Sequence, residues 1–98
     1  MNDNLHNNVK NAATILLYSV ANADQNIEKD EIKIIKEIIQ DFFSVESQDA
    51  YDIVESAIVE FKKSTSYFEY AQILNENFSY QDKLDFIYCI YELSLIHI

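Results

Sequence analysis

The most regular feature of the chain is the recurrence of apolar residues at steps of three and four, the period of an amphipathic α-helix with one buried stripe. The first such run ends near Asp24, because Asp24, Gln25 and Asn26 supply no apolar side chain. Several of its apolar positions are alanines, which let a second helix approach closely, so we expect this helix to be central. The apolar residues of the run are Leu5, Val9, Ala12, Ala13, Leu16, Leu17, Val20 and Ala23.

Two further runs of the same period predict a second and a third helix. The third is opened by Ser47 after a short loop, and it ends at Lys62 and Lys63, whose charges complement the negative end of a helix dipole. The second run starts after Ile27, with lysines and other polar residues mostly on the opposite side. Its apolar side consists of Ile32, Ile35, Ile38, Ile39, Phe42 and Phe43.

Two polar pairs predict where the last two helices begin. Ser66 stands three residues before Glu69, and Ser79 stands three residues before Asp82. This is the spacing of a capping box, in which each side chain accepts a hydrogen bond from the other's backbone N–H. A fourth and a fifth helix should therefore start at these two serines.

Length and composition strengthen the helical interpretation. The chain has 98 residues, with no glycine and no proline. A chain of this length forms a single core, and tight hairpins usually need glycine at their turns. We therefore predict an all-α fold, a bundle of about five amphipathic helices that forms one domain over residues 1–98.

The net charge of −10, from 17 acidic residues against seven lysines and no arginine, excludes several kinds of partner. Nucleic acids and anionic membrane surfaces require a clustered basic face. An acidic surface instead suits divalent cations or basic partners. The N-terminus lacks the basic and apolar segments of a secretory signal, so we expect a cytoplasmic protein.

The C-terminal run from Phe86 to Ile98 is nearly all apolar, although Glu92 interrupts it. It is too short for a bilayer span, which needs about 20 residues. The chain stops here without a capping residue, which predicts that the natural protein continues past Ile98. An apolar helix end left without its packing partner would favour self-association.

The junction between the first two helices concentrates four acids, Asp24, Glu28, Asp30 and Glu31, within eight positions. One interpretation is electrostatic, since carboxylates in a first helical turn are stabilised by the helix dipole. The other is a cation site. Glu31 stands four residues before Ile35, so it leads into the buried stripe, where a carboxylate needs a donor or a cation. Asp24, Glu28 and Glu31 would then bind a hard cation such as Ca²⁺, Mg²⁺ or Mn²⁺.

An EF-hand does not explain this junction. Counted from Asp24, the first, third and fifth positions carry suitable oxygens. The sixth position is Lys29, where that loop requires glycine, and the twelfth is Ile35, where it requires a bidentate glutamate. The cation site, if formed, is of another kind.

The segment Ala21-x-Ala23-Asp24-x-x-Ile27-x-x-x-Glu31, which ends one apolar helix and opens another, resembles the first signature of the TerB-like tellurite-resistance family. The resemblance implies an all-helical bundle and a divalent-metal site built on the acids. It also implies a role in stress-related or membrane-associated assemblies, including a helical domain attached to some J-domain co-chaperones.

The chain departs from that family's pattern in two places. Gln25 replaces a glycine of the signature. The family repeats the acidic signature after a later helix, and here the residues after Leu93 are Ser-Leu-Ile-His-Ile. A site that needs acids from both loops would be half built, so we expect weak cation affinity.

The remaining residues offer little catalytic chemistry. His6 and His97 lack partners at metal-ligand spacing. Cys89, in an apolar run, is expected to be a core side chain. Tyr67, Phe68 and Tyr70 indicate an exposed aromatic patch for a protein partner; the other aromatic residues should mainly pack in the core.

We therefore predict a protein that is not an enzyme. It would be a TerB-like module that binds a divalent cation weakly or interacts with other proteins in a stress response. The alternative is a purely structural or protein-binding helical bundle in which the acids only cap a helix.

Overall fold

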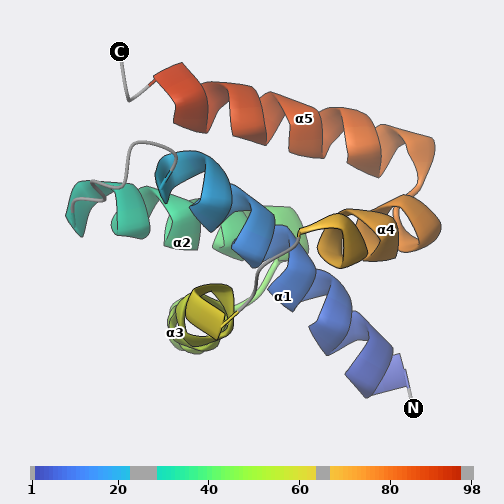
Figure 1. Ribbon diagram of the computed structural model, residues 1–98, viewed down its shortest axis with the longest axis horizontal. Helices are drawn as coiled ribbons and strands as arrows, with labels where there is room; N and C mark the ends of the chain where they lie inside the picture. The colour runs from blue at the N-terminus through green and yellow to red at the C-terminus, as the bar shows by residue number, and fades with distance from the viewer. Residues whose placement is uncertain (1, 23–28, 64–66, 96–98) are drawn as a thin grey trace.

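The computed structural model describes residues 2–22, 29–63 and 67–95. The elements within those ranges are five α-helices, which confirms the all-α prediction. Figure 1 shows α1 running diagonally through the middle of the molecule, with α5 along one side and α3 on the other. The helices are α1 (Asn2–Ala21), α2 (Lys29–Phe43), α3 (Ser47–Lys63), α4 (Phe68–Asn77) and α5 (Tyr80–Leu95).

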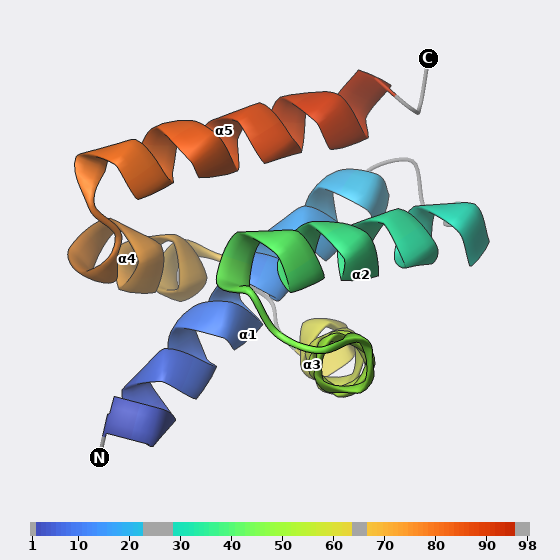
Figure 2. The ribbon, with the colours of Figure 1, turned by 180° about the vertical axis from the view of Figure 1, so that it is seen from behind.

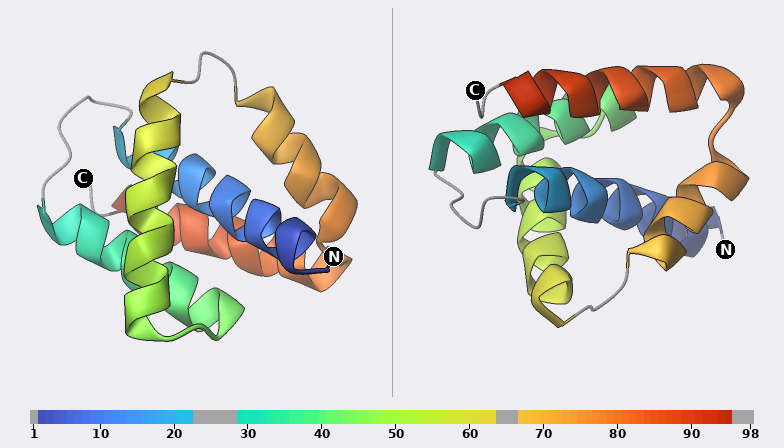
Figure 3. Two further views of the ribbon diagram at one scale, coloured as in Figure 1. Left: turned by 90° about the horizontal axis from the view of Figure 1, so that it is seen from below. Right: turned by 45° about the horizontal axis from the view of Figure 1, so that its top comes forward.

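Helix α1 is the centre of the bundle, as its alanines predicted. It contacts each of the other four helices, and Figure 3 shows α3 crossing it. Ala12 and Ala13 are completely buried. The prediction of one buried stripe is wrong, because Thr14 and Ile15, outside that stripe, are also completely buried. The Thr14 hydroxyl donates a 2.8 Å hydrogen bond to the Lys10 carbonyl oxygen, which satisfies the buried polar group.

Helix α2 follows its predicted pattern closely. Ile35 and Ile39 are completely buried at its centre, while the other four predicted apolar residues are partly buried against the core. The last turn of α2 joins an aromatic cluster with Phe78, the residue after α4, and with Phe86 of α5. The ring centroid of Phe42 lies 5.5 Å from that of Phe78 and 5.8 Å from that of Phe86.

Helix α5 has one face against the bundle and one face away from it. It contacts α1 and α2, and Figure 2 shows it along one side of the molecule. Phe86 and Leu93 are its buried residues. Within the described ranges, none of the helices combines the length and the apolar character that a membrane span requires.

The capping predictions have different outcomes. The Ser79 N–H donates to Asp82 Oδ2 (3.2 Å) and the Asp82 N–H donates to Ser79 Oγ (3.1 Å), which confirms the capping box of α5. Helix α4 begins at Phe68, and its N-cap residue, Tyr67, makes no side-chain capping bond. Ser66 lies outside the described residues, so the predicted pairing of Ser66 with Glu69 stays a prediction. Helix α3 includes Ser47 as its first residue.

The end of α2 uses a left-handed residue that is not glycine. Ser44 has φ 54°, and the Val45 N–H donates a 3.1 Å hydrogen bond to the Gln40 carbonyl oxygen. This bond closes the helix as a Schellman motif does, and Val45 packs against the core beside it.

A non-glycine residue in this conformation costs about 1 kcal/mol, so Ser44→Gly should raise the free energy of unfolding by up to about 1 kcal/mol, measured by urea denaturation. Ser44→Val should lower it, because a β-branched side chain tolerates this backbone conformation poorly. A glycine variant less stable than the original chain would contradict this account of the turn.

Candidate cation site at the junction of the first two helices

Glu31 is the one predicted ligand whose side chain the structure describes. It is the third residue of α2, and only 9% of its surface is exposed. Ile35 and Ile39 follow at steps of four and are completely buried. Glu31 therefore heads the buried row of α2, as its spacing from Ile35 predicted. Its carboxylate belongs to the first helical turn, where the helix dipole favours negative charge.

The structure describes the side chain of none of the other acids of the junction. Asp24 and Glu28 lie outside the described residues, as do Gln25 and Ile27. The backbone of Asp30 belongs to the first turn of α2, but its side chain is outside the described set. The predicted convergence of Asp24, Glu28 and Glu31 thus stays a prediction, with Glu31 alone located.

Three helix ends meet at the same end of the molecule. In Figures 1 to 3 the last turn of α1, the first turn of α2 and the last turn of α5 lie there together. Ala21, Ile35 and Leu93, one from each helix, belong to one buried cluster. The residues after α5, where the resemblance to the TerB-like family would place a second acidic signature, lie outside the described residues.

The described residues form no metal-ligand cluster of their own. Within residues 2–22, 29–63 and 67–95, no group of three or more His, Cys, Asp or Glu side chains could hold a metal ion. This absence does not apply to a site that includes Asp24 or Glu28, because both residues lie outside the described ranges. The side chains of His6 and His97 also lie outside the described set.

Cys89 lies on α5 and is partly buried against the core. Burial raises the pKa of its thiol above the ordinary value, and the negative charges of Glu92 and Asp85 raise it further. The thiolate is the reactive form of cysteine, so this side chain is a poor nucleophile at neutral pH.

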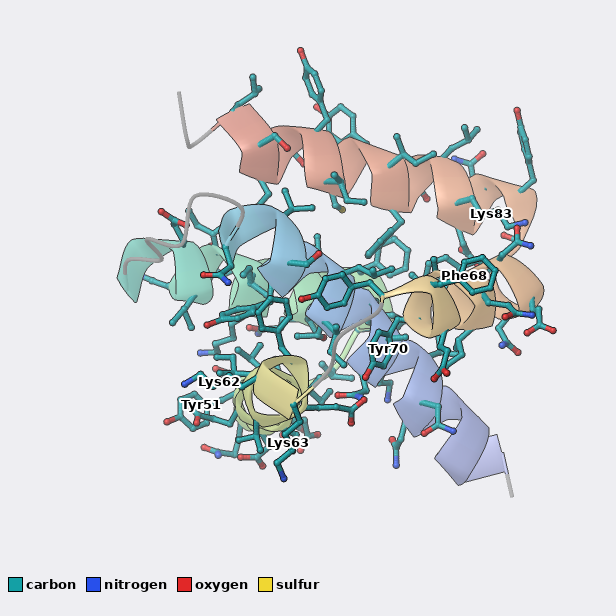
Figure 4. All side chains as sticks on the ribbon, in the orientation of Figure 1. Tyr51, Lys62, Lys63, Phe68, Tyr70 and Lys83 are labelled. Carbon is teal, nitrogen blue, oxygen red and sulfur yellow. The ribbon has the colours of Figure 1, made fainter. Side chains whose placement is uncertain are left out.

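The predicted aromatic patch on α4 is smaller than expected. Phe68 is 74% exposed. Tyr67 stacks on Phe61, with ring centroids 5.3 Å apart and an interplanar angle of 4°, and Tyr70 is partly buried against the core. Figure 4 labels Phe68 and Tyr70 on this helix. Of the three aromatic residues, Phe68 is therefore the most exposed, Tyr67 is 36% exposed, and Tyr70 is partly buried.

An open groove lined mostly by polar residues lies between α1 and α3, and no pattern in the sequence predicted it. Its volume is about 620 Å³. Asn11 Nδ2 donates a 3.2 Å hydrogen bond to Glu60 Oε1 across it. The groove is lined by Asn7, Asn8, Lys10, Asn11, Val45, Asp49, Asp52, Ile53, Ser56 and Glu60.

A second feature missed by sequence reasoning is the side of α5 that faces away from the bundle. Six of its large apolar or aromatic side chains are between 44% and 77% exposed. This contradicts the expectation that the tyrosines mainly pack in the core. The sequence did contain a signal for this exposed face, because the C-terminal run is apolar on all sides of the helix. A helix that packs on one side only cannot bury both of its faces. The α5 outer face comprises Tyr80, Leu84, Ile87, Tyr88, Tyr91 and Leu95.

Comparison with known proteins identifies the family. The family model described as tellurite resistance protein TerB matches residues 10–95. No curated protein and no solved structure gives a significant match. The matched region runs from the first half of α1 to the end of α5 and includes the acidic junction with Glu31. The chain therefore belongs to the TerB tellurite resistance family.

Proposed function

We propose that this TerB domain is a non-catalytic module that binds a divalent cation weakly at the α1–α2 junction. Asp24 and Glu31 would be its main ligands, with Glu28 as a third. The observation that supports the proposal is the 9% exposure of Glu31 in the first turn of α2. A carboxylate at that depth is stabilised by a nearby positive charge.

The donor set fits a hard cation. Carboxylate oxygens are preferred by Ca²⁺, Mg²⁺ and Mn²⁺, whereas softer metals favour thiolate or imidazole ligands. When bound, the cation would supply positive charge that offsets the repulsion among the four clustered acids. Glu31 would hold the α2 side of the site and Asp24 the segment that follows α1, so binding would stabilise the junction.

A calorimetric titration with Ca²⁺, Mg²⁺ and Mn²⁺ tests this proposal. We expect saturable heat with a dissociation constant of about 10⁻⁴ to 10⁻³ M, the range of weak calcium modules. The double variant Asp24→Asn with Glu31→Gln should show no heat. As a charge control, Asp52→Asn with Glu46→Gln removes two exposed carboxylates elsewhere and should bind as the original chain does. No heat from the original chain would overturn the proposal.

A protein-interaction module is the second candidate, and the α5 outer face favours it. In that case the acids of the junction only stabilise the start of α2, and the functional surface is the exposed side of α5. Family membership supports a role in stress response under either candidate. We place the protein in the cytoplasm for both.

A further inference from the structure

We propose that the α5 outer face binds an amphipathic helix of another protein that carries lysine or arginine along one edge of its apolar face. The proposal rests on the interaction candidate and not on cation binding. It concerns a part of the chain that the acidic junction does not include.

The α5 outer face has the geometry of a helix-packing surface. Successive residues of this face are three or four positions apart, except for Ile87 and Tyr88, which are neighbours. The six side chains therefore form one stripe along the helix. The most exposed are Tyr80 at 77%, Tyr88 at 63%, and Ile87 and Tyr91 at 61% each. The stripe extends over all four turns of α5, from Tyr80 to Leu95. Six of the ten exposed large hydrophobic residues in the described ranges belong to it.

One edge of the stripe is acidic. Asp85 stands three residues before Tyr88 and Glu92 four residues after it, so both carboxylates border the stripe on that side. Both residues are exposed, and the charges of both raise the pKa of Cys89, which lies on the same side. Asp85 Oδ1 accepts a 2.9 Å hydrogen bond from Gln81 Nε2. Among the described residues, no lysine forms a salt bridge with either carboxylate.

The opposite edge offers no comparable negative charge. Lys83 borders the stripe there, and its Nζ donates a 2.9 Å hydrogen bond to Asn75 Oδ1 of α4. Figure 4 shows Lys83 near the corner where α4 and α5 meet. Ser94 donates its hydroxyl hydrogen to the Ile90 carbonyl oxygen. The stripe is therefore asymmetric, with its negative charge on the Asp85 and Glu92 edge.

This asymmetry favours a basic helix over a second copy of the chain. Two copies joined antiparallel through the same face would place the two acidic edges against each other, and each chain carries a net charge of −10. A basic edge on the partner would meet Asp85 and Glu92 with opposite charge.

The test uses the whole chain and two fluorescein-labelled 18-residue peptides with the same leucine and alanine face. One peptide carries lysines along an edge of that face and the other carries glutamates. In fluorescence anisotropy the lysine peptide should bind saturably and more weakly as salt increases, and the glutamate peptide should not bind. A scrambled lysine peptide of equal composition shows how much binding comes from net charge alone, and it should bind at least tenfold more weakly.

Variants of the chain test both parts of the surface. Ile87→Ser should weaken binding of the lysine peptide about tenfold or more, as loss of a central apolar contact does. Val59→Ser on α3, where Val59 is 54% exposed, is the matched control and should have no effect. Asp85→Asn with Glu92→Gln should weaken binding about two- to tenfold. The charge control Asp52→Asn with Glu46→Gln has the same net charge as the double variant of Asp85 and Glu92. Asp52 also resembles Asp85 in accepting a hydrogen bond from a glutamine four residues earlier.

Three results would overturn the proposal. The first is no binding of the lysine peptide. The second is equal weakening by the two charge variants, which would mean that only net charge is recognised. The third is a dimer in sedimentation equilibrium that Ile87→Ser abolishes, which would make a second copy the occupant. Asp24→Asn with Glu31→Gln should leave peptide binding unchanged, so failure of the cation proposal is distinguished from failure of this one.

Discussion

Leu93→Ala is expected to lower the free energy of unfolding by about 3 kcal/mol, within the range of about 2–5 kcal/mol for buried leucines. Leu93 is completely buried in the hydrophobic core, on the helix that packs against α1 and α2. Removing its side chain leaves a cavity in that core. Urea denaturation followed by circular dichroism measures the change.

Leu95 provides the matched control, because it lies two residues further along the same helix. It is 48% exposed on the α5 outer face, so Leu95→Ala should change stability by no more than about 0.5 kcal/mol. The substitution is the same in both variants, and so is the change in helix propensity. Equal effects of the two variants would show that the burial of α5 has been assigned to the wrong face.

The helices that sequence reasoning predicted well are those whose signal is local. Ser79 and Asp82 form a capping box because both partners lie within four residues of each other, and no distant contact is required. The buried row of α2 was equally clear, since polar residues occupy the opposite side of that helix. The Ser66 and Glu69 spacing predicted the start of α4 to within two residues, since that helix begins at Phe68.

Helices α1 and α5 show what periodicity cannot decide. Thr14 and Ile15 are buried because four helices surround α1, and the number of neighbours is a property of the whole fold. Along α5 both sides are apolar, so the pattern does not choose between Leu93, which is buried, and Tyr91, which is 61% exposed. The choice depends on how α5 docks against α1 and α2.

The candidate cation site also has one feature that the sequence predicts and one that it does not. The burial of Glu31 followed from its spacing to Ile35, which is fixed within one helix. The approach of Asp24 to Glu31 depends on the path of the segment between α1 and α2, and no helical period determines that path. The sequence therefore predicts the burial of Glu31. Whether Asp24 and Glu31 bind one cation together is tested by the cation titration.

Ala13→Leu should be the second strongly destabilising substitution, with a loss of about 2–3 kcal/mol in the free energy of unfolding. Ala13 is completely buried on the helix that contacts all four others. A leucine there adds three carbons where neighbouring side chains already fill the space, so neighbouring helices must move apart or adopt strained rotamers. Urea denaturation again gives the free energy, and the slope of the transition reports whether the folded state stays compact.

Ala71→Leu on α4 makes the same chemical change at an exposed position. Leucine and alanine have similar helix propensities, so this control should stay within about 0.5 kcal/mol of the original chain. The difference between the two variants then measures packing around α1 rather than the effect of a larger side chain in a helix. If Ala13→Leu were as stable as Ala71→Leu, the space around α1 would have to be loosely filled, and the junction behind Glu31 would lack the rigid support that a preorganised cation site requires.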